Sequence, residues 1–240
     1  MSLIYVSSDD DDDSQPFNGV SSSGSTVYIE GVSHDLSSLR PKTWIRTDVI
    51  DLFFEKLNKY YETNVPSRRI LFSRTSAWET YNIGQTARFD NIRIPEVALV
   101  PINDNNTHWF LMKIDFITER VTFIDTSGGQ DTTVTSTMNK NYDKAMHFVH
   151  SVTGSIRKPY FETSIDRSLQ QNDNFSCGIY VMGNALHLAA VGGLRKIRPE
   201  MLRPHIDDFL RGGSDDPSSL LVHTSRCNDC SKRRKLSRKK

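Results

Sequence analysis

A cysteine stands at the start of a long apolar stretch. Cys177 opens CGIYVMGNALHLAAVGG, whose spacing predicts a buried helix that ends at Gly192-Gly193. Unpaired N–H groups and the helix dipole at such a start favour an anion, so a thiol there is suited to act as a thiolate nucleophile. The polar residues 170–174, QQNDN, predict a loop that leads into the helix. The alternative is that Cys177 is a small buried hydrophobe, the commoner role of a lone cysteine.

A histidine and an aspartate are expected to meet across a hairpin. His108 opens HWFLMKID after a polar loop, and Asp125 lies near the end of RVTFIDT, before a Ser-Gly-Gly turn. Both runs are short and rich in branched and aromatic residues, which predicts two paired strands. Antiparallel pairing brings the start of one strand beside the end of the other, so His108 should lie next to Asp125 or Thr126. A carboxylate there would orient the ring and support its charged form. The alternative for Asp125 is a turn-starting residue.

These residues together supply the groups needed for covalent catalysis at a carbonyl carbon. Cys177 is the candidate nucleophile, His108 the base and Asp125 the orienting acid. Gln171, six residues before the cysteine, adds a side-chain amide. With the backbone N–H of Cys177 it could stabilise a developing oxyanion. Gln170 is the alternative donor if the loop bulges.

The elements that must position these residues follow from the hydrophobic periodicity. Helical spacing begins at Val49, with Thr47 or Asp48 as the expected cap. Pro199 occupies a first-turn position in the last predicted helix. Helices on either side of a central sheet make an α+β fold. The predicted strands are 97–102, 108–115, 120–126 and 158–163, and the predicted helices are 48–62, 135–152, 177–191 and 199–210.

Composition divides the 240 residues into three parts. Residues 1–40 are rich in Ser, Gly and Asp, which predicts a flexible arm, with order starting near Pro41. Residues 41–222 are expected to form one globular domain. Residues 223–240 form a basic tail, in which seven of the last ten residues are Lys or Arg. We interpret this tail as a nuclear-import signal, with a solubilising end or a weak nucleic-acid contact as alternatives.

The number of cysteines and the length of the apolar runs indicate the compartment of the protein and whether it binds a metal or a membrane. Only three cysteines occur, too few for a disulfide framework, so we expect a reducing compartment, the nucleus and also the cytoplasm. Cys227 and Cys230 have zinc-like spacing with His223 nearby, but a structural zinc needs four ligands, so we expect no metal. No apolar run approaches the roughly 20 residues that span a bilayer, so we expect no membrane partner.

Four motifs in order resemble those of the ubiquitin-like-protein proteases, the SUMO/sentrin-specific cysteine proteases. They are WIRTDVID, VALVPINDNNTHWFLMKID, RVTFIDTSGG and QNDNFSCGIYV, within residues 40–212. Members of this family share a His-Trp pair, an aspartate 17 residues later before Gly-Gly, and a glutamine six residues before Cys-Gly. This chain departs from the family at Ser176, where aspartate is usual. It also departs at Arg46-Thr47, where relatives carry an Asn-Asp pair that grips the modifier.

The resemblance implies a fold, a reaction and a substrate. The fold is the papain-like or adenain-like cysteine protease fold, with a central mixed β-sheet flanked by helices. The reaction is cleavage of the isopeptide or precursor peptide bond after the C-terminal Gly-Gly of SUMO, without a cofactor. The Gly-Gly tail threads a channel between two tryptophans, which correspond to Trp44 and Trp109; core packing is the alternative for Trp44. The expected partners are SUMO or a related modifier and its conjugates. We expect a monomer and no nucleic-acid partner.

The first residues add a second contact with the modifier. Leu3, Ile4, Tyr5 and Val6 precede two serines and five aspartates. Residues 3–13 thus resemble a SUMO-interacting motif, which adds a strand to an exposed sheet edge. Phosphorylation of the serines should strengthen it. The alternative is a generic acidic tail.

Other functions stay open at this point. The protease could act on a NEDD-type modifier or ubiquitin, or serve as a pathogen effector inside a host. A catalytically dead SUMO reader would require a broken triad. An acyltransferase of the same clan would require an acyl donor. The modifier or SUMO paralogue preferred, the target proteins and the source organism do not follow from the residues.

Overall fold

The computed structural model describes residues 26–29, 32–80, 94–104, 106–127, 131–153 and 161–221. Several features expected from the sequence lie outside these ranges. They are the motif at residues 3–13 with Leu3, Ile4, Tyr5 and Val6, the Gly128-Gly129 turn, and the basic tail with Cys227 and Cys230. Their interpretations stay predictions.

A mixed five-stranded sheet forms the centre of the fold, in the order β3-β4-β5-β6-β7. The three middle strands β4, β5 and β6 run antiparallel to one another, and the outer strands β3 and β7 pair in parallel with β4 and β6. The bounds are β3 Ile70–Phe72, β4 Val97–Asp104, β5 His108–Asp115, β6 Arg120–Ile124 and β7 Glu162–Asp166.

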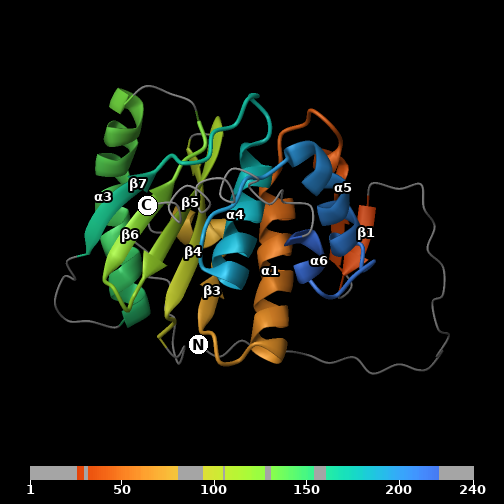
Figure 1. Cartoon of the computed structure of the whole chain (residues 1–240), viewed down its shortest axis with the longest axis horizontal. Helices are drawn as coiled ribbons and strands as arrows, with labels where there is room; N and C mark the ends of the chain where they lie inside the picture. The colour runs from red at the N-terminus through yellow and green to blue at the C-terminus, as the bar shows by residue number, and fades with distance from the viewer. Residues whose placement is uncertain are drawn as a thin grey trace, which may run out of the picture.

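Helices cover both faces of this sheet (Figure 1). One face packs against α1, α4, α5 and α6, and the other against α2 and α3. The bounds are α1 Thr47–Asn64, α2 Thr75–Thr80, α3 Asp131–Thr153, α4 Cys177–Val191, α5 Pro199–Leu210 and α6 Ser218–Leu221.

The alternation of side chains along β5 divides the interior into two cores. Trp109 and Leu111 pack into the core with α1 and α4, whereas Phe110 and Met112 pack into the core with α3. Successive side chains of a strand point to opposite faces, so a strand buried on both faces reads as a continuous apolar run. This explains why the middle strands could be predicted from composition.

The predicted core elements are confirmed with shifted ends. The three middle strands and the four predicted helices are present, and α4 ends at Gly192 in the left-handed conformation, with φ of 72°. The strand expected at 158–163 is instead β7, Glu162–Asp166. The expected side-chain cap of α1 is wrong, because Arg46 precedes the helix and makes no cap hydrogen bond.

Residues 26–39 correct the expectation that order begins near Pro41. Strands β1 (Thr26–Ile29) and β2 (Val32–Asp35) form an antiparallel hairpin, followed by a short 3-10 helix, Ser37–Leu39. Leu36 and Leu39 are buried in the core that contains α1. Burial of these leucines stabilises a segment whose polar composition had suggested a flexible arm.

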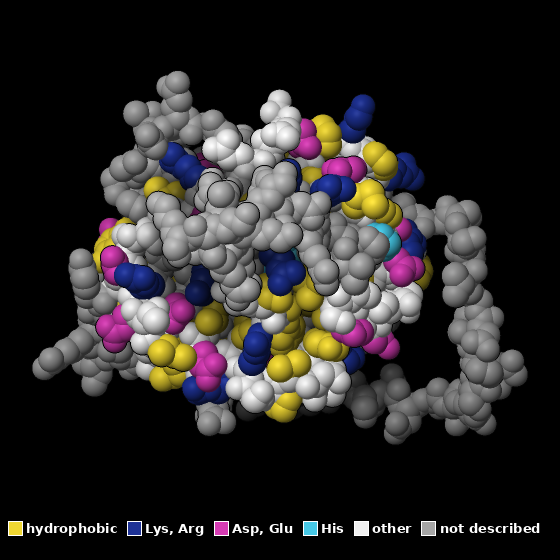
Figure 2. Space-filling view, viewed as in Figure 1, with side chains coloured by type: hydrophobic (Ala, Val, Ile, Leu, Met, Phe, Trp, Pro, Cys, Tyr) yellow, Lys and Arg dark blue, Asp and Glu magenta, His cyan; other side chains and the backbone are white. Residues whose placement is uncertain are grey.

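The surface carries charges of both signs. On the face seen in Figure 2, acidic and basic side chains of the described residues are interspersed with hydrophobic ones. Within the described part of the chain, none of the helices combines the length and apolar character needed to cross a bilayer.

The interior of α4 contains two polar side chains with unpaired atoms. His187 is fully buried, and neither ring nitrogen has a hydrogen-bond partner among the described residues. The Asn184 side-chain oxygen, one turn earlier, is also unpaired there. Burial, and to a smaller extent the charge of Arg195, lowers the pKa of His187 from 6.5 to about 4. His187 is therefore neutral in the folded protein at pH 7.

We expect His187 to destabilise the fold in mild acid. Its pKa is lower when folded than when unfolded, so the unfolded chain binds more protons between pH 6.5 and 4. His187 should thus lower the free energy of unfolding by roughly 1 kcal/mol per pH unit as the pH falls through this window. Urea unfolding at pH 7.5 and pH 5 should show a smaller loss for His187→Leu than for wild type. Equal losses in the two proteins would contradict this account.

Candidate active site

His108 and Asp125 meet at one end of the sheet, as the hairpin predicts. His108 is the first residue of β5, and Asp125 follows the last residue of β6. The Nε2 atom of His108 lies 2.8 Å from Oδ1 of Asp125. The ring is partly exposed and the carboxylate is buried. The aspartate therefore anchors the inner edge of an imidazole that reaches solvent.

Asp125 is held as a carboxylate by several donors. Ser127 donates its backbone N–H to Oδ1 and its hydroxyl to Oδ2, at 2.9 and 2.8 Å. Burial raises the pKa of Asp125, but the hydrogen bonds with His108 and Ser127 and the charge of His108 lower it below its usual value. Asp125 therefore has both of the roles considered for it, because it orients His108 and also organises the turn that follows β6.

Cys177 is the second partner of the imidazole. It is the first residue of α4 and is fully buried, and its interaction with His108 contributes to the raised pKa of that ring. Burial lowers the pKa of His108, but the hydrogen bonds with Asp125 and Cys177 and the charges of both raise it to about 9. At neutral pH the arrangement therefore favours an imidazolium beside the Asp125 carboxylate, with Cys177 on the same ring.

The loop before Cys177 is organised by Asp173. Its carboxylate accepts the backbone N–H groups of Phe175 and Ser176 and the Ser176 hydroxyl, at 2.8–2.9 Å. Ser176, which stands where the family usually has aspartate, is thus buried with a carboxylate partner. This role of Asp173 was not predicted from the sequence. The available signal was an aspartate in a polar loop just before a helix, because aspartate often accepts the backbone N–H groups two and three residues later.

Gln171 lies in this loop and is tied to the end of the sheet. Its backbone N–H donates to the Thr126 carbonyl, and its side-chain oxygen accepts the Thr126 hydroxyl. Its amide nitrogen donates to the Asp173 carbonyl at 2.7 Å. An amide nitrogen carries two hydrogens, so a second one is available to an oxyanion. The role predicted for Gln171 stays a prediction.

The first turn of α4 packs against the segment that carries Trp44. A Cβ atom on Gly178 would lie 2.6 Å from Cβ of Ile45, which is closer than two side-chain carbons approach. The Trp109 indole N–H donates to the Ile45 carbonyl at 3.0 Å. Ile45 is therefore held between α4 and β5, and Trp44 precedes it directly.

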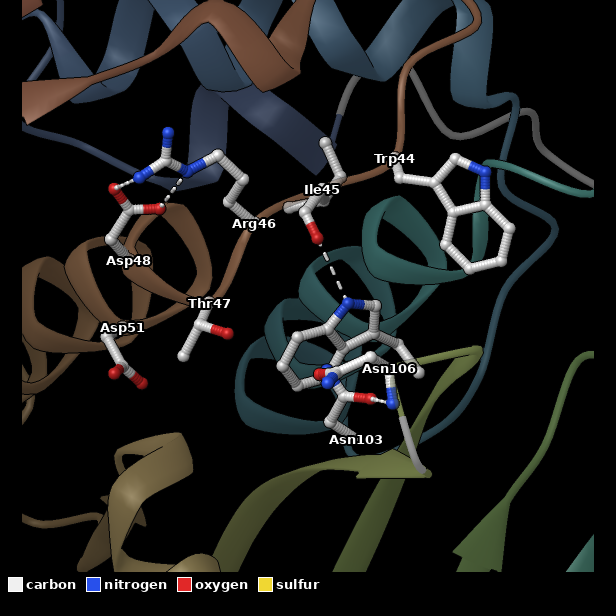
Figure 3. Close-up of a pocket in the computed structure, with 9 residues that line it drawn as sticks. Trp44, Ile45, Arg46, Thr47, Asp48, Asp51, Asn103 and Asn106 are labelled. Atoms are coloured by element: carbon white, nitrogen blue, oxygen red, sulfur yellow. Dashed lines mark hydrogen bonds and ion pairs between the residues drawn. The ribbon is translucent and has the colours of Figure 1, made fainter.

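A pocket of about 460 Å³ lies beside this contact (Figure 3). Trp44 and Trp109 both line it; Trp109 is buried, whereas Trp44 is 44% exposed. Exposure of Trp44 argues against simple core packing. The side chains of Trp44 and Arg46 point to opposite sides. The remaining lining residues are Ile45, Arg46, Thr47, Asp48, Asp51, Asn103 and Asn106.

Arg46 is one of the positions at which this chain departs from the family pattern, and acidic neighbours compensate its positive charge. Its guanidinium contacts Asp35 at 3.2 Å and Asp48 at 3.1 Å, and its side chain is more than half exposed. Exposed pairs of this kind contribute little to stability. Arg46 thus brings little uncompensated positive charge to the pocket.

The described residues include no group of His, Cys, Asp and Glu side chains arranged to hold a metal ion. What they do bring together is a thiol, an imidazole and a carboxylate beside a tryptophan-lined pocket. This arrangement can carry out nucleophilic attack on a carbonyl carbon, followed by hydrolysis.

Comparison with known proteins identifies the family to which the chain is similar. The family described as the Ulp1 protease family, C-terminal catalytic domain, matches residues 21–213. Ubiquitin-like-specific protease 1 of Saccharomyces cerevisiae is 22% identical over 164 residues, 68% of this chain and 26% of that protein. The chain thus spans about a quarter of the length of this relative.

Two solved structures share the fold at low identity. The SUMO protease Ulp1 with its catalytic cysteine oxidized to a sulfenic acid has a TM-score of 0.61 at 17% identity, covering 80% of this chain and 90% of that one. The C-terminal Ulp1 protease domain in complex with Smt3, the yeast ortholog of SUMO, has a TM-score of 0.60 at 18% identity, covering 82% and 91%. The expected α+β fold with a central mixed sheet is confirmed.

The contact between Gly178 and Ile45 generates a prediction. Gly178→Ala should displace Ile45 and with it Trp44, and so lower thioester or amide hydrolysis by about tenfold or more. The matched control is Gly193→Ala at the other end of α4, where an added Cβ meets nothing within 4 Å. Steady-state hydrolysis of a Gly-Gly amide reporter measures both. Equal rates for the two variants would show that the close approach has no part in activity.

Proposed function

Because the chain belongs to the Ulp1 protease family, we propose that it is a cysteine protease that cleaves the bond after the C-terminal Gly-Gly of SUMO. The bond is the lysine isopeptide of a conjugate or the peptide bond of a precursor. The observation that carries the proposal is the His108–Asp125 contact of 2.8 Å, with Cys177 interacting with the same ring.

The first half of the reaction transfers the modifier to the enzyme. The Cys177 thiolate attacks the carbonyl carbon of the final glycine and forms a tetrahedral intermediate. The C–N bond then breaks, and the proton on His108 passes to the leaving lysine amine. The products are a free amine and a thioester between Cys177 and the modifier. Asp125 keeps the ring oriented and stabilises its charged form.

The second half releases the modifier. With its proton transferred, neutral His108 takes a proton from water, and the hydroxide equivalent attacks the thioester carbon. The C–S bond breaks, which frees the glycine carboxyl group, whose proton passes to solvent, and returns Cys177 as a thiolate beside protonated His108. In both halves the carbonyl oxygen carries negative charge, which the Cys177 N–H and Gln171 are proposed to stabilise.

Substrate selection is proposed to depend on the tryptophan-lined pocket. Trp109 is fixed by its bond to Ile45, and Trp44 is attached to the same segment. A channel between two indoles admits an extended Gly-Gly tail, because a larger side chain would clash with the rings. The similarity of the chain to the Ulp1 domain solved with Smt3 supports SUMO as the modifier.

A panel of electrophilic probes tests the proposal. Each probe carries one modifier, SUMO, a NEDD-type modifier or ubiquitin, with a vinyl sulfone after its Gly-Gly. We expect the SUMO probe to label the wild-type protein at Cys177, and no probe to label Cys177→Ala. Intact mass and peptide mapping identify the labelled residue. Labelling by another modifier instead of SUMO would reassign the substrate, and labelling by none would overturn the proposal.

We further propose that Leu3, Ile4, Tyr5 and Val6 bind SUMO as an added strand and direct the enzyme to poly-SUMO. Two contacts with one chain of modifiers raise the effective affinity without any change at the active site. The aliphatic residues would fill the apolar groove, and the aspartates would face basic residues beside it.

The double variant Leu3→Ala, Ile4→Ala tests this role of the first residues. It should cleave a single-SUMO amide reporter at the wild-type rate but disassemble poly-SUMO chains about tenfold more slowly. Gel-based time courses at limiting enzyme measure the second rate. Unchanged disassembly of the chains would refute the role of the motif.

A further inference from the structure

An arginine of α5 makes four hydrogen bonds to backbone carbonyls from two distant segments. Arg203 is 4% exposed. Its Nη1 atom donates to Ser38 O and Arg40 O, both at 3.1 Å. Its Nη2 atom donates to Thr43 O at 2.7 Å and Phe175 O at 3.1 Å. A planar guanidinium is suited to hold acceptors in such a fixed arrangement.

The positions of these carbonyls connect Arg203 with the active site. Thr43 directly precedes Trp44, and Phe175 lies two residues before Cys177. A single nitrogen atom therefore joins the segment that carries Trp44 to the loop that delivers the nucleophile. The Arg203 guanidinium also lies over the Phe175 ring, 5.9 Å from its centroid.

Stability alone does not account for an arginine at this place. Among the described residues the structure records no ion pair for Arg203 closer than 4 Å, and four carbonyls solvate its charge instead. Burial lowers the pKa of Arg203, while the charges of Asp173 and Cys177 raise it. Well-packed apolar residues often stabilise a protein as much as a buried charge does. What an arginine adds is the ability to fix two backbone segments in one geometry.

We propose that Arg203 is a positioning residue that sets the placement of Cys177 relative to the Trp44 segment and to His108. The role in substrate alignment rests on the proposed function. The carbonyl carbon of the substrate must reach the sulfur while its tail lies in the pocket beside Trp44. Small displacements of reacting groups lower rates by up to about a hundredfold. Arg203 touches neither substrate nor sulfur in this account and acts through the two segments.

Arg203→Lys tests the proposal because it keeps the positive charge but loses the planar fork. The matched control is Arg68→Lys. Arg68 also donates to backbone carbonyls, those of Ala189 and Ala190, at the opposite end of α4. Ile206→Val is a second control, since Ile206 is fully buried on the same helix as Arg203 and should loosen α5 without affecting either segment. Thermal unfolding by circular dichroism records the stability of each variant.

Two readouts separate positioning from stability. For a SUMO amide reporter, we expect kcat of Arg203→Lys to fall by about ten- to a hundredfold, with KM changed much less. We also expect the NMR-measured pKa of His108 to fall from about 9, because a displaced Cys177 interacts less with the ring and helps less to raise this pKa. Both controls should keep the wild-type kcat and His108 pKa. Phe175→Leu, which removes the ring beside the guanidinium, should shift both readouts in the same direction but less.

The opposite pattern would overturn the proposal. One such outcome is that Arg203→Lys has a lower melting temperature but the same kcat and His108 pKa as Ile206→Val. The other is that Arg68→Lys lowers kcat and the His108 pKa as much as Arg203→Lys does. If Arg203→Lys unfolds, the same readouts on Phe175→Leu decide the matter. The NMR titration needs no substrate. A wild-type protein that leaves the SUMO reporter uncut would therefore refute the proposed function, while the His108 values would still decide the role of Arg203.

Discussion

The close contact between the first turn of α4 and Ile45 is the constraint on which the site depends. Gly178 leaves no room for even a methyl group against Ile45. This contact brings the start of the helix, and thus Cys177, beside the segment that presents Trp44. Trp109 holds the same segment from β5 through the Ile45 carbonyl. The start of α4, the segment that carries Trp44 and strand β5 are therefore parts of one packed unit.

Electrostatics then determines the protonation state of this unit. Asp125 is kept charged by His108 and Ser127, and His108 is kept protonated to about pH 9 by Asp125 and Cys177 against the effect of burial. Asp125 and His108 favour each other's charged form, so the ring is protonated at neutral pH. The same principle explains His187 in reverse: burial without a partner favours its neutral form.

The chain keeps the fold of the Ulp1 structures although it shares few residues with them. The chain shares 17–18% of residues with the Ulp1 structures and yet superimposes over about four fifths of its length. A sheet of five strands and the helices on its two faces can be built from many apolar sequences that preserve volume and pattern. We expect less tolerance where backbone segments approach closely, as at Gly178, or where a buried charge must be satisfied, as at Arg203.

The sequence by itself determined the main elements and the contact between His108 and Asp125. Apolar runs buried on both faces identified the middle strands, and hairpin pairing predicted that His108 would meet Asp125. These inferences rest on the local hydrophobic pattern and on the pairing of strands that follow each other in the chain. Both can be recognised from residues that are close together in the sequence. The ordered structure within residues 26–39 could not be predicted in this way. Their polar composition suggested a flexible arm, whereas Leu36 and Leu39 are buried against helices from elsewhere in the chain.

Only the tertiary structure decided how the segments are joined. Arg203 lies 28 residues beyond Phe175 and 160 beyond Thr43, and no local pattern links these positions. The bond from Trp109 to Ile45 and the contact between Gly178 and Ile45 likewise depend on how α4 packs against the sheet. Hydrogen bonds to backbone carbonyls are independent of the acceptor's side chain, so the sequence contains no sign of which carbonyls a buried arginine will reach.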